Sequence, residues 1–313
     1  MIEPAILAAI HRRLDRALAP PTIRLRPFVV ADVTIGYIDD TRAKRLARFG
    51  SDVFSVDADR VEFAPALKDE RTRSKAIAAV ADALRAEGAL PGWRDELYRV
   101  AARFDHPPLL HIERGAARYF GVQTYAAHVN AIVRTAQMTS MWLARRSMTK
   151  ATDPGMLDNL VAGGIGSGLS IRDTVIKEAW EEAGIGTELA ARAQHTGTVH
   201  ILRSLSDGLQ RETVFVHDIE LPSDFQPVNQ DGEVTECRRV SLEEAAATIA
   251  IDGEIDEVTV DASLVVLDFL IRNDDIRRDQ PQFNDLDALR YRGAADPLAQ
   301  RSNVTPTQRP VSL

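Results

Sequence analysis

Several features are scarce in this 313-residue sequence, and each scarcity excludes a class of protein. The single cysteine, Cys237, rules out an intrachain disulfide and a cysteine-based zinc site, and it suits a reducing compartment. Basic residues are outnumbered, with 38 Lys and Arg against 46 Asp and Glu and a formal net charge of −8. A nucleic-acid partner normally requires a basic surface, so we expect none.

Long apolar runs are also missing. No stretch approaches the roughly 18 uncharged apolar residues that a membrane span needs. The first residues, MIEPAILAAIHRRLDRALAPP, form an amphipathic pattern interrupted by charge, rather than the basic start and unbroken apolar run of a signal peptide. We therefore expect a cytoplasmic protein that does not associate with membranes.

Length and a 45% hydrophobic content predict two domains with real cores. Residues 1–118 alternate helix-like patterns (4–18, 40–49, 69–88) with strand-like patterns (22–30, 33–38, 53–64). This indicates a small α+β companion domain without recognisable chemistry. A second domain is predicted for 119–275, and residues 276–313 look like a loose C-terminal extension.

The second domain begins with strand patterns at 121–133 and 140–147. A hairpin is predicted over 196–222, because Asp207-Gly208 near its centre favours a tight turn. A strand follows near 232–240, then a capping box formed by Ser241 and Glu244, and a closing helix at 260–273.

A glycine-rich segment, GGIGSG at 163–168, leads into an acidic helix. Ser170 is a good N-cap, Asp173 completes a capping box, and Gly184 favours a left-handed C-terminal cap, so the helix should span 171–183. At 100° per residue, three glutamates share one face, and the opposite face should pack. The acidic face holds Glu178, Glu181 and Glu182, and the packing face holds Ile176, Ala179, Trp180 and Ala183.

Carboxylates held at a fixed spacing suit a hard divalent ion such as Mg²⁺, which prefers oxygen ligands. An acidic helix alone is more often an ordinary solvated face. The adjacent glycine segment changes this balance, because it lets the backbone approach a ligand closely.

In these residues the chain resembles the Nudix box, G-x5-E-x7-R-E-U-x-E-E-x-G-U. The positions that match are Gly163, Glu178, Ala179, Glu181, Glu182, Gly184 and Ile185. Leu169 replaces the first glutamate, which leaves the number of metal ions open, and Lys177 replaces the arginine. The resemblance implies an α+β Nudix fold, with a mixed sheet between helices. It also implies Mg²⁺, or alternatively Mn²⁺, held by Glu178, Glu181, Glu182 and the Gly163 carbonyl.

The stretches at 111–133, 141–165 and 218–245 further resemble the thiamine pyrophosphokinase-related branch of Nudix proteins. That branch carries an N-terminal companion domain of unknown function. The resemblance implies hydrolysis of thiamine diphosphate, or of a damaged analogue, to the monophosphate.

Other candidate residues surround this helix. General-base candidates are Glu181, Glu182, Glu233 and Glu236. Candidates for substrate binding are Trp142, Arg145, Arg146, Lys150, Gly163 and Gly164. Side chains alternate along a strand, so at most one of the two arginines should face the pocket. Trp142 either stacks on the substrate's ring or packs in the core.

Several readings stay open beside a magnesium-dependent hydrolase of a small diphosphate. One is a nucleotide-sugar or ADP-ribose pyrophosphatase. Another is an isoprenyl diphosphate isomerase, which would need Cys237 as a catalytic residue. A third is a non-catalytic ligand-binding module. The sequence also leaves open whether the chain forms a homodimer.

Overall fold

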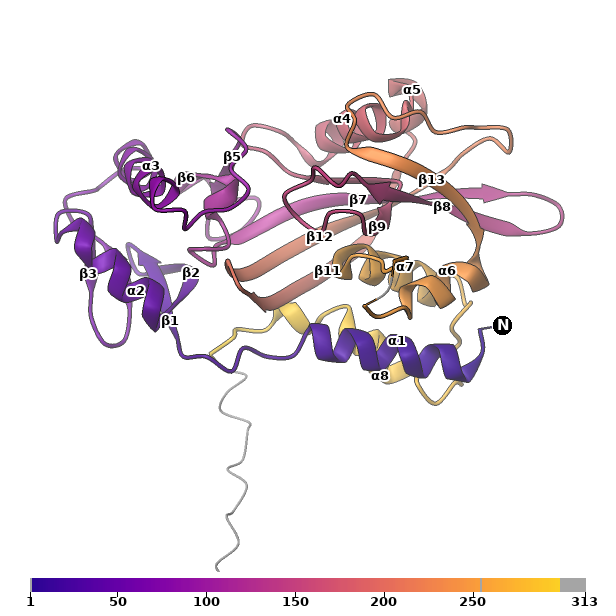
Figure 1. The fold of residues 1–313 in the computed structure, drawn as a ribbon, viewed down its shortest axis with the longest axis horizontal. Coiled ribbons are helices and arrows are strands. Elements are labelled where there is room, and N and C mark those ends of the chain that lie inside the picture. The colour runs from indigo at the N-terminus through magenta and orange to yellow at the C-terminus, as the bar shows by residue number, and fades with distance from the viewer. Residues whose placement is uncertain (1, 254, 299–313) are drawn as a thin grey trace, which may run out of the picture.

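A computed structural model describes residues 2–253 and 255–298. The chain forms two units that lie side by side (Figure 1). We call residues 25–122 the N-terminal unit, and the first helix together with residues 123–298 the large unit. Among the described residues, no helix has the length and apolar character needed to cross a bilayer.

The N-terminal unit is built on a four-stranded sheet in the order β2-β1-β4-β3. Phe28 lies at the centre of its core, with ring centroids 5.2–6.0 Å from those of Phe54, Phe63 and Phe120. A separate hairpin, β5–β6, faces the large unit. The elements are β1 (Leu25–Val30), β2 (Val33–Asp39), α2 (Asp40–Leu46), a 3-10 turn (Ala47–Phe49), β3 (Phe54–Val56), β4 (Val61–Phe63), α3 (Glu70–Ala86), β5 (Leu97–Val100), β6 (Leu110–Glu113) and a second 3-10 turn (Arg114–Ala116).

The large unit is a mixed sheet in the order β11-β12-β7-β8-β13, with β10 paired to β7 and β9 to β8. Helices cover both faces, which confirms the predicted sheet between helices (Figure 1). Its strands are β7 (Gln123–Arg134), β8 (Thr139–Arg146), β9 (Leu157–Asn159), β10 (Val161–Gly164), β11 (Gln194–Leu205), β12 (Gly208–Glu220) and β13 (Val234–Ser241). Its helices are α1 (Pro4–Ala17), α4 (Ile171–Ala183), α5 (Thr187–Ala190), α6 (Leu242–Ile249), α7 (Val260–Arg272), α8 (Phe283–Leu289) and a 3-10 turn (Arg292–Ala294).

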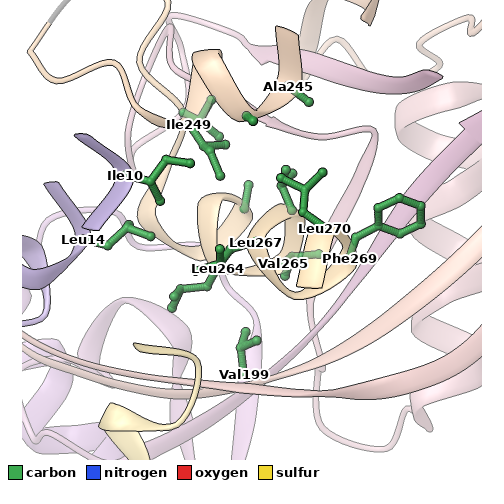
Figure 2. Packing of buried hydrophobic residues seen from close by; sticks show 14 of the residues in the cluster. Ile10, Leu14, Val199, Ala245, Ile249, Leu264, Val265, Leu267, Phe269 and Leu270 are labelled. Atoms are coloured by element: carbon green, nitrogen blue, oxygen red, sulfur yellow. The ribbon is translucent and has the colours of Figure 1, made fainter. Parts of the chain in front are cut away.

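Helix α7 is the centre of the larger core, because eleven of its residues are buried. Figure 2 shows this helix between α6, α1 and the sheet, with Leu264 and Leu267 beside Ile10 and Leu14 of α1 and Val199 of β11 on the sheet side. The amphipathic first helix therefore belongs to the core of the large unit, although the sequence assigned it to the companion domain. The predicted domain boundaries themselves stay predictions.

The loose extension predicted beyond residue 275 is wrong for residues 276–298. Ile276, Leu286 and Leu289 are fully buried in the core that α1 and α7 share. Arg290 adds an ion pair with the buried Asp268 of α7. Burial of these apolar side chains holds the segment in place, and residues 299–313 lie outside the described part.

Candidate active site

Helix α4 forms where the sequence predicts it, from Ile171 to Ala183. The Ser170 hydroxyl accepts a hydrogen bond from the Asp173 N–H at 3.1 Å, and the Asp173 carboxylate accepts one from the Ser170 N–H. Gly184 ends the helix with φ 66°, a left-handed conformation that glycine adopts without strain. The helix is therefore fixed at both ends, as the capping pattern predicts.

The face on which α4 packs differs from the prediction. Trp180 is 52% exposed, whereas Glu182 is only 4% exposed. The buried stripe runs through Val175, Ala179 and Glu182, at a spacing of four and three residues, so it is rotated toward the glutamates. One of the three carboxylates is thus part of the packing face.

Glycines allow this close packing between helix and sheet. A Cβ on Gly163 would lie 2.3 Å from Cγ and Cδ of Glu178, so only glycine admits that side chain. Gly163 and Gly164 belong to strand β10, not to a loop, and they pair with Ala127 and Ala126 of β7. The role of Gly163 that the geometry supports is to make room for Glu178.

The three glutamates have different partners. Glu182 Oε2 accepts a hydrogen bond from the Ala162 N–H at 2.7 Å. Lys177 Nζ lies 3.0 Å from Glu178 Oε1 and 2.6 Å from Glu181 Oε2. Within residues 2–253 and 255–298, no three His, Cys, Asp or Glu side chains are grouped as a metal site. In this arrangement the carboxylates do not converge on one point.

The chemistry of the donor set nevertheless fits a divalent cation. Burial raises the pKa of Glu178. Burial, and then the charge of Glu178, raise the pKa of Glu182 to about 8. The half-buried Glu178 and the buried Glu182, one helical turn apart, repel each other, and a cation between them would offset both the repulsion and the desolvation.

A cavity of about 520 Å³ opens beside this helix, and both units line it. Glu178 and Glu181 belong to its wall, whereas Glu182 is buried and does not line it. The N-terminal unit contributes Arg94, Glu96, Tyr98, Arg114 and Arg118, and the large unit contributes Arg146, Lys150, Gly163, Gly164, Lys177 and Glu233 among others.

Four cationic side chains gather at the end of the cavity near the glutamates. Arg146 forms an ion pair with Asp158 at 2.8 Å, and Lys150 lies against Glu233 and 4.0 Å from Glu182. Arg94 and Arg114 approach from the N-terminal unit. Burial lowers the pKa of Arg94, and the neighbouring positive charges of Arg114 and Arg146 lower it further. Such a group of cations is suited to a polyanion.

The N-terminal unit touches the glycine segment directly. The Ser167 N–H donates to the Leu97 carbonyl at 2.7 Å, and the Ser167 hydroxyl lies 2.8 Å from His111 Nδ1. Arg114 is held by Glu96 at 2.8 Å. The sequence assigned no chemistry to residues 1–118. These side chains lie far from the box in sequence, and no local pattern marks them.

Three predicted site residues lie elsewhere. Arg145 is bound by Glu236 and Asp256 on the other side of β8, so of the two arginines only Arg146 lines the cavity. Glu236 is likewise engaged, with Arg145 and Arg238, and is absent from the wall. Trp142 shares the face of Arg146 but lies four residues earlier, about 13 Å along the strand.

Trp142 is buried in the core under α4, and its indole N–H has no partner among the described residues. It cannot stack on a ring bound in the cavity. Cys237 is packed against the same core, outside the cavity wall, and burial raises the pKa of its thiol to about 11. A protonated thiol there does not suit catalysis of an isomerisation.

Comparison with known proteins matches both units. Residues 12–124 match the domain described as "Domain of unknown function (DUF4743)", and residues 124–259 match the NUDIX domain. The chain is 38% identical over 262 residues to "Nudix hydrolase 24, chloroplastic" of Arabidopsis thaliana, covering 83% of this chain and 71% of that protein. It is 36% identical over 269 residues to "Nudix hydrolase 20, chloroplastic" of the same plant, with the same two coverages.

Among solved structures, the MutT protein of Methanosarcina mazei Go1 matches with 21% identity and a TM-score of 0.36, over 50% of this chain and 98% of that one. The identity to these two plant proteins agrees with the match of the NUDIX domain to the segment that carries α4. The chain belongs to the Nudix hydrolase family.

Proposed function

We propose that this Nudix hydrolase cleaves a diphosphate linkage in a small molecule with the help of Mg²⁺. The observation that carries the proposal is the meeting of two opposite charge sets at one end of the cavity. The carboxylates of Glu178 and Glu181 share the cavity wall with Arg94, Arg114, Arg146 and Lys150, and Lys150 lies 4.0 Å from the buried Glu182. A diphosphate and its cation would neutralise both sets together.

Each charged residue has a definite task in this proposal. Glu178 and Glu182 would hold the ion, and Glu181 would join them after leaving Lys177, 2.6 Å away. When bound, Mg²⁺ would neutralise the diphosphate and make water a better nucleophile. Arg146, Lys150 and the two arginines of the N-terminal unit would orient the phosphate oxygens.

The chemical step needs one proton acceptor. Water attacks a phosphorus atom, the bond from that phosphorus to the bridging oxygen breaks, and the proton of the water passes to a carboxylate. Glu181 and Glu233 both line the cavity and remain the candidates for this role. Glu182, also predicted as a candidate, is buried outside the cavity wall and accepts a hydrogen bond from the Ala162 N–H. Glu236 is withdrawn from this role, because it lies outside the wall and is paired with Arg145.

For the substrate we propose thiamine diphosphate or a damaged analogue, cleaved to the monophosphate and phosphate. Support comes from the resemblance to the thiamine pyrophosphokinase-related branch and from the N-terminal companion domain at residues 12–124. We also propose the cytoplasm as the compartment, since the lone Cys237 suits a reducing environment. Imaging of a tagged full-length chain tests that part.

Product analysis by phosphorus NMR tests the activity, because ADP-ribose and nucleotide sugars are cleaved to two phosphomonoesters and release no free phosphate. The full chain is assayed with Mg²⁺ on thiamine diphosphate, oxidised thiamine diphosphates, ADP-ribose and nucleoside diphosphate sugars. We expect turnover that a chelator abolishes and Mg²⁺ restores, and a loss of about a hundredfold or more in Glu178→Gln. The matched control is Glu236→Gln, whose carboxylate lies outside the cavity.

No turnover of any diphosphate would overturn the proposal. Calorimetry then identifies the non-catalytic alternative: a binding module retains one of these compounds with Mg²⁺ and leaves it intact. Preferential turnover of ADP-ribose or a nucleotide sugar would support the diphosphate hydrolase activity but would contradict thiamine diphosphate as the substrate.

A further inference from the structure

The end of the cavity away from α4 is acidic. We call Asp153, Gln210, Glu212 and Asp261 the acidic half; all four line the cavity. Gln210 lies at its centre, and its amide nitrogen donates to Asp261 Oδ2 at 2.9 Å and to Glu212 Oε2 at 3.1 Å. Glu212 Oε1 also accepts from the Thr124 hydroxyl at 3.0 Å.

Two acceptor atoms in this group have no donor in the part of the chain that the structure describes. Gln210 is 4% exposed, yet its Oε1 is without a hydrogen-bond partner among those residues, and so is the buried Oδ1 of Asp261. A buried acceptor left unsatisfied costs free energy, and most such atoms in proteins are paired. Because these residues line a cavity, the missing donors can come from a molecule that enters it.

The charge of the acidic half is also not fully balanced. Burial raises the pKa of Glu212 and of Asp153, and in each case the charge of Asp261 raises it further. Arg118, Arg146, Arg203 and His128 lower these pKa values but do not offset the burial, and Arg118 and Arg146 are already paired with Asp207 at 3.5 Å and Asp158 at 2.8 Å. The acids are not grouped as a metal site in the described residues. The group that would complement the negative charge of the acidic half is therefore an organic cation.

The register of the sheet places the acidic half at a useful distance from the glutamates. Glu212 on β12 is opposite Thr124 of β7, and Gly164 on β10 is opposite Ala126 of the same strand. Two strand spacings, about 10 Å, therefore separate β12 from β10. Glu178 and the acidic half line the same cavity, so a diphosphate beside Glu178 leaves the acidic half to the rest of the substrate.

We propose that the acidic half binds the organic part of the substrate, and that this part is positively charged and carries N–H donors. The donors bond to Gln210 Oε1 and Asp261 Oδ1, and the positive charge faces Glu212 and Asp261. The assignment rests on the proposed function, because it takes the opposite end of the cavity as the diphosphate site. It makes these residues determinants of specificity rather than of the chemical step.

Three diphosphates distinguish binding of the organic part from binding of the diphosphate. Thiamine diphosphate has a positively charged organic part with an amino group. Isopentenyl diphosphate has a neutral, apolar organic part, and inorganic pyrophosphate has no organic part. In Glu212→Gln and Asp261→Asn we expect kcat/KM for thiamine diphosphate to fall about tenfold to a hundredfold. For the other two we expect a change under about threefold. The matched control is Glu220→Gln, an exposed carboxylate on the same strand β12.

An equal loss for all three diphosphates, or no loss for thiamine diphosphate, would overturn the assignment. Calorimetry with thiamine itself, which has no phosphate, makes the test independent of hydrolysis. Binding to the unaltered chain that weakens in Asp261→Asn supports the assignment even if no diphosphate is cleaved, and absence of binding there refutes it. Thermal unfolding identifies a variant that fails to fold, and the other of the two variants then serves alone.

Discussion

The phenol oxygen of Tyr98 occupies the place where a side chain at position 164 would begin, 1.8 Å from the ideal Cβ position of Gly164. This contact joins hairpin β5–β6 of the N-terminal unit to strand β10 of the large unit. Since the cavity wall includes both residues, the fit between the units determines its shape.

Gly164→Ala should loosen this joint. The added methyl group must displace Tyr98, so we expect a loss of about 1–3 kcal/mol in the free energy of unfolding and a raised KM. Urea unfolding and steady-state kinetics measure the two effects. Gly186→Ala is the control, because Gly186 has φ −62° and open space around it. Equal stability of the two variants would contradict the contact.

Arg94→Ala should raise KM about tenfold with a smaller effect on kcat, because Arg94 faces the cavity from the N-terminal unit. Arg145→Ala removes an equal charge from β8 outside the cavity wall. It should lower stability by breaking its ion pairs and leave KM unchanged. A KM effect confined to Arg145→Ala would restore the original assignment of that residue to the substrate.

Trp142→Phe tests whether Trp142 stacks on the substrate or only packs in the protein core. Phenylalanine keeps most of the ring volume and removes an indole N–H that is buried without a partner in the described part of the chain, so we expect a stability change below about 1.5 kcal/mol. We also expect KM for every substrate to stay the same. A KM increase specific to heteroaromatic diphosphates would mean that Trp142 reaches the ligand.

The metal-free protein should lose stability as pH rises. Glu182 has a pKa of about 8 in the folded chain against 4.5 as its ordinary value, so the folded state holds this proton more tightly. Its stabilising contribution is complete below about pH 4.5 and is lost as the pH rises toward 8.

Glu182→Gln should therefore match the unaltered chain near pH 5 and exceed its stability near pH 8. Denaturant unfolding in a chelator at both pH values measures this difference. Glu220→Gln, at an exposed position, should keep the original slope. If Glu182→Gln shows the same pH dependence of stability as the unaltered chain, the Glu182 carboxylate is not the cause of that dependence.

Local chemistry made much of the fold predictable. The ends of α4 follow from Ser170, Asp173 and Gly184, and the hairpin turn follows from Asp207-Gly208. The rotation of α4 could not be predicted, because helical periodicity places Glu182 with the other glutamates. Its burial depends on the Ala162 N–H, which comes from a strand twenty residues earlier in the chain.

The site was predictable only where its residues are neighbours in sequence. Glu178, Lys150 and Arg146 lie close to the box and were found, whereas Arg94 and Arg114 come from another unit. The alternation of side chains along β8 predicted that only one of Arg145 and Arg146 faces the cavity, but it did not predict which one. That choice depends on which face of the sheet α4 covers, a tertiary property.

The packing of α1 has a practical consequence for anyone who wishes to isolate the hydrolase half. The N-terminal unit is inserted into the large unit in sequence, because α1 precedes it and β7 follows it, and both belong to the large unit. A fragment cut at residue 119 would lose the helix that shields Leu264, and with it the ion pair between Asp15 and Arg292 at 2.7 Å. We therefore expect a fragment that begins at residue 119 to aggregate. Deleting residues 25–122 and joining the ends with a linker would keep α1 packed over Leu264.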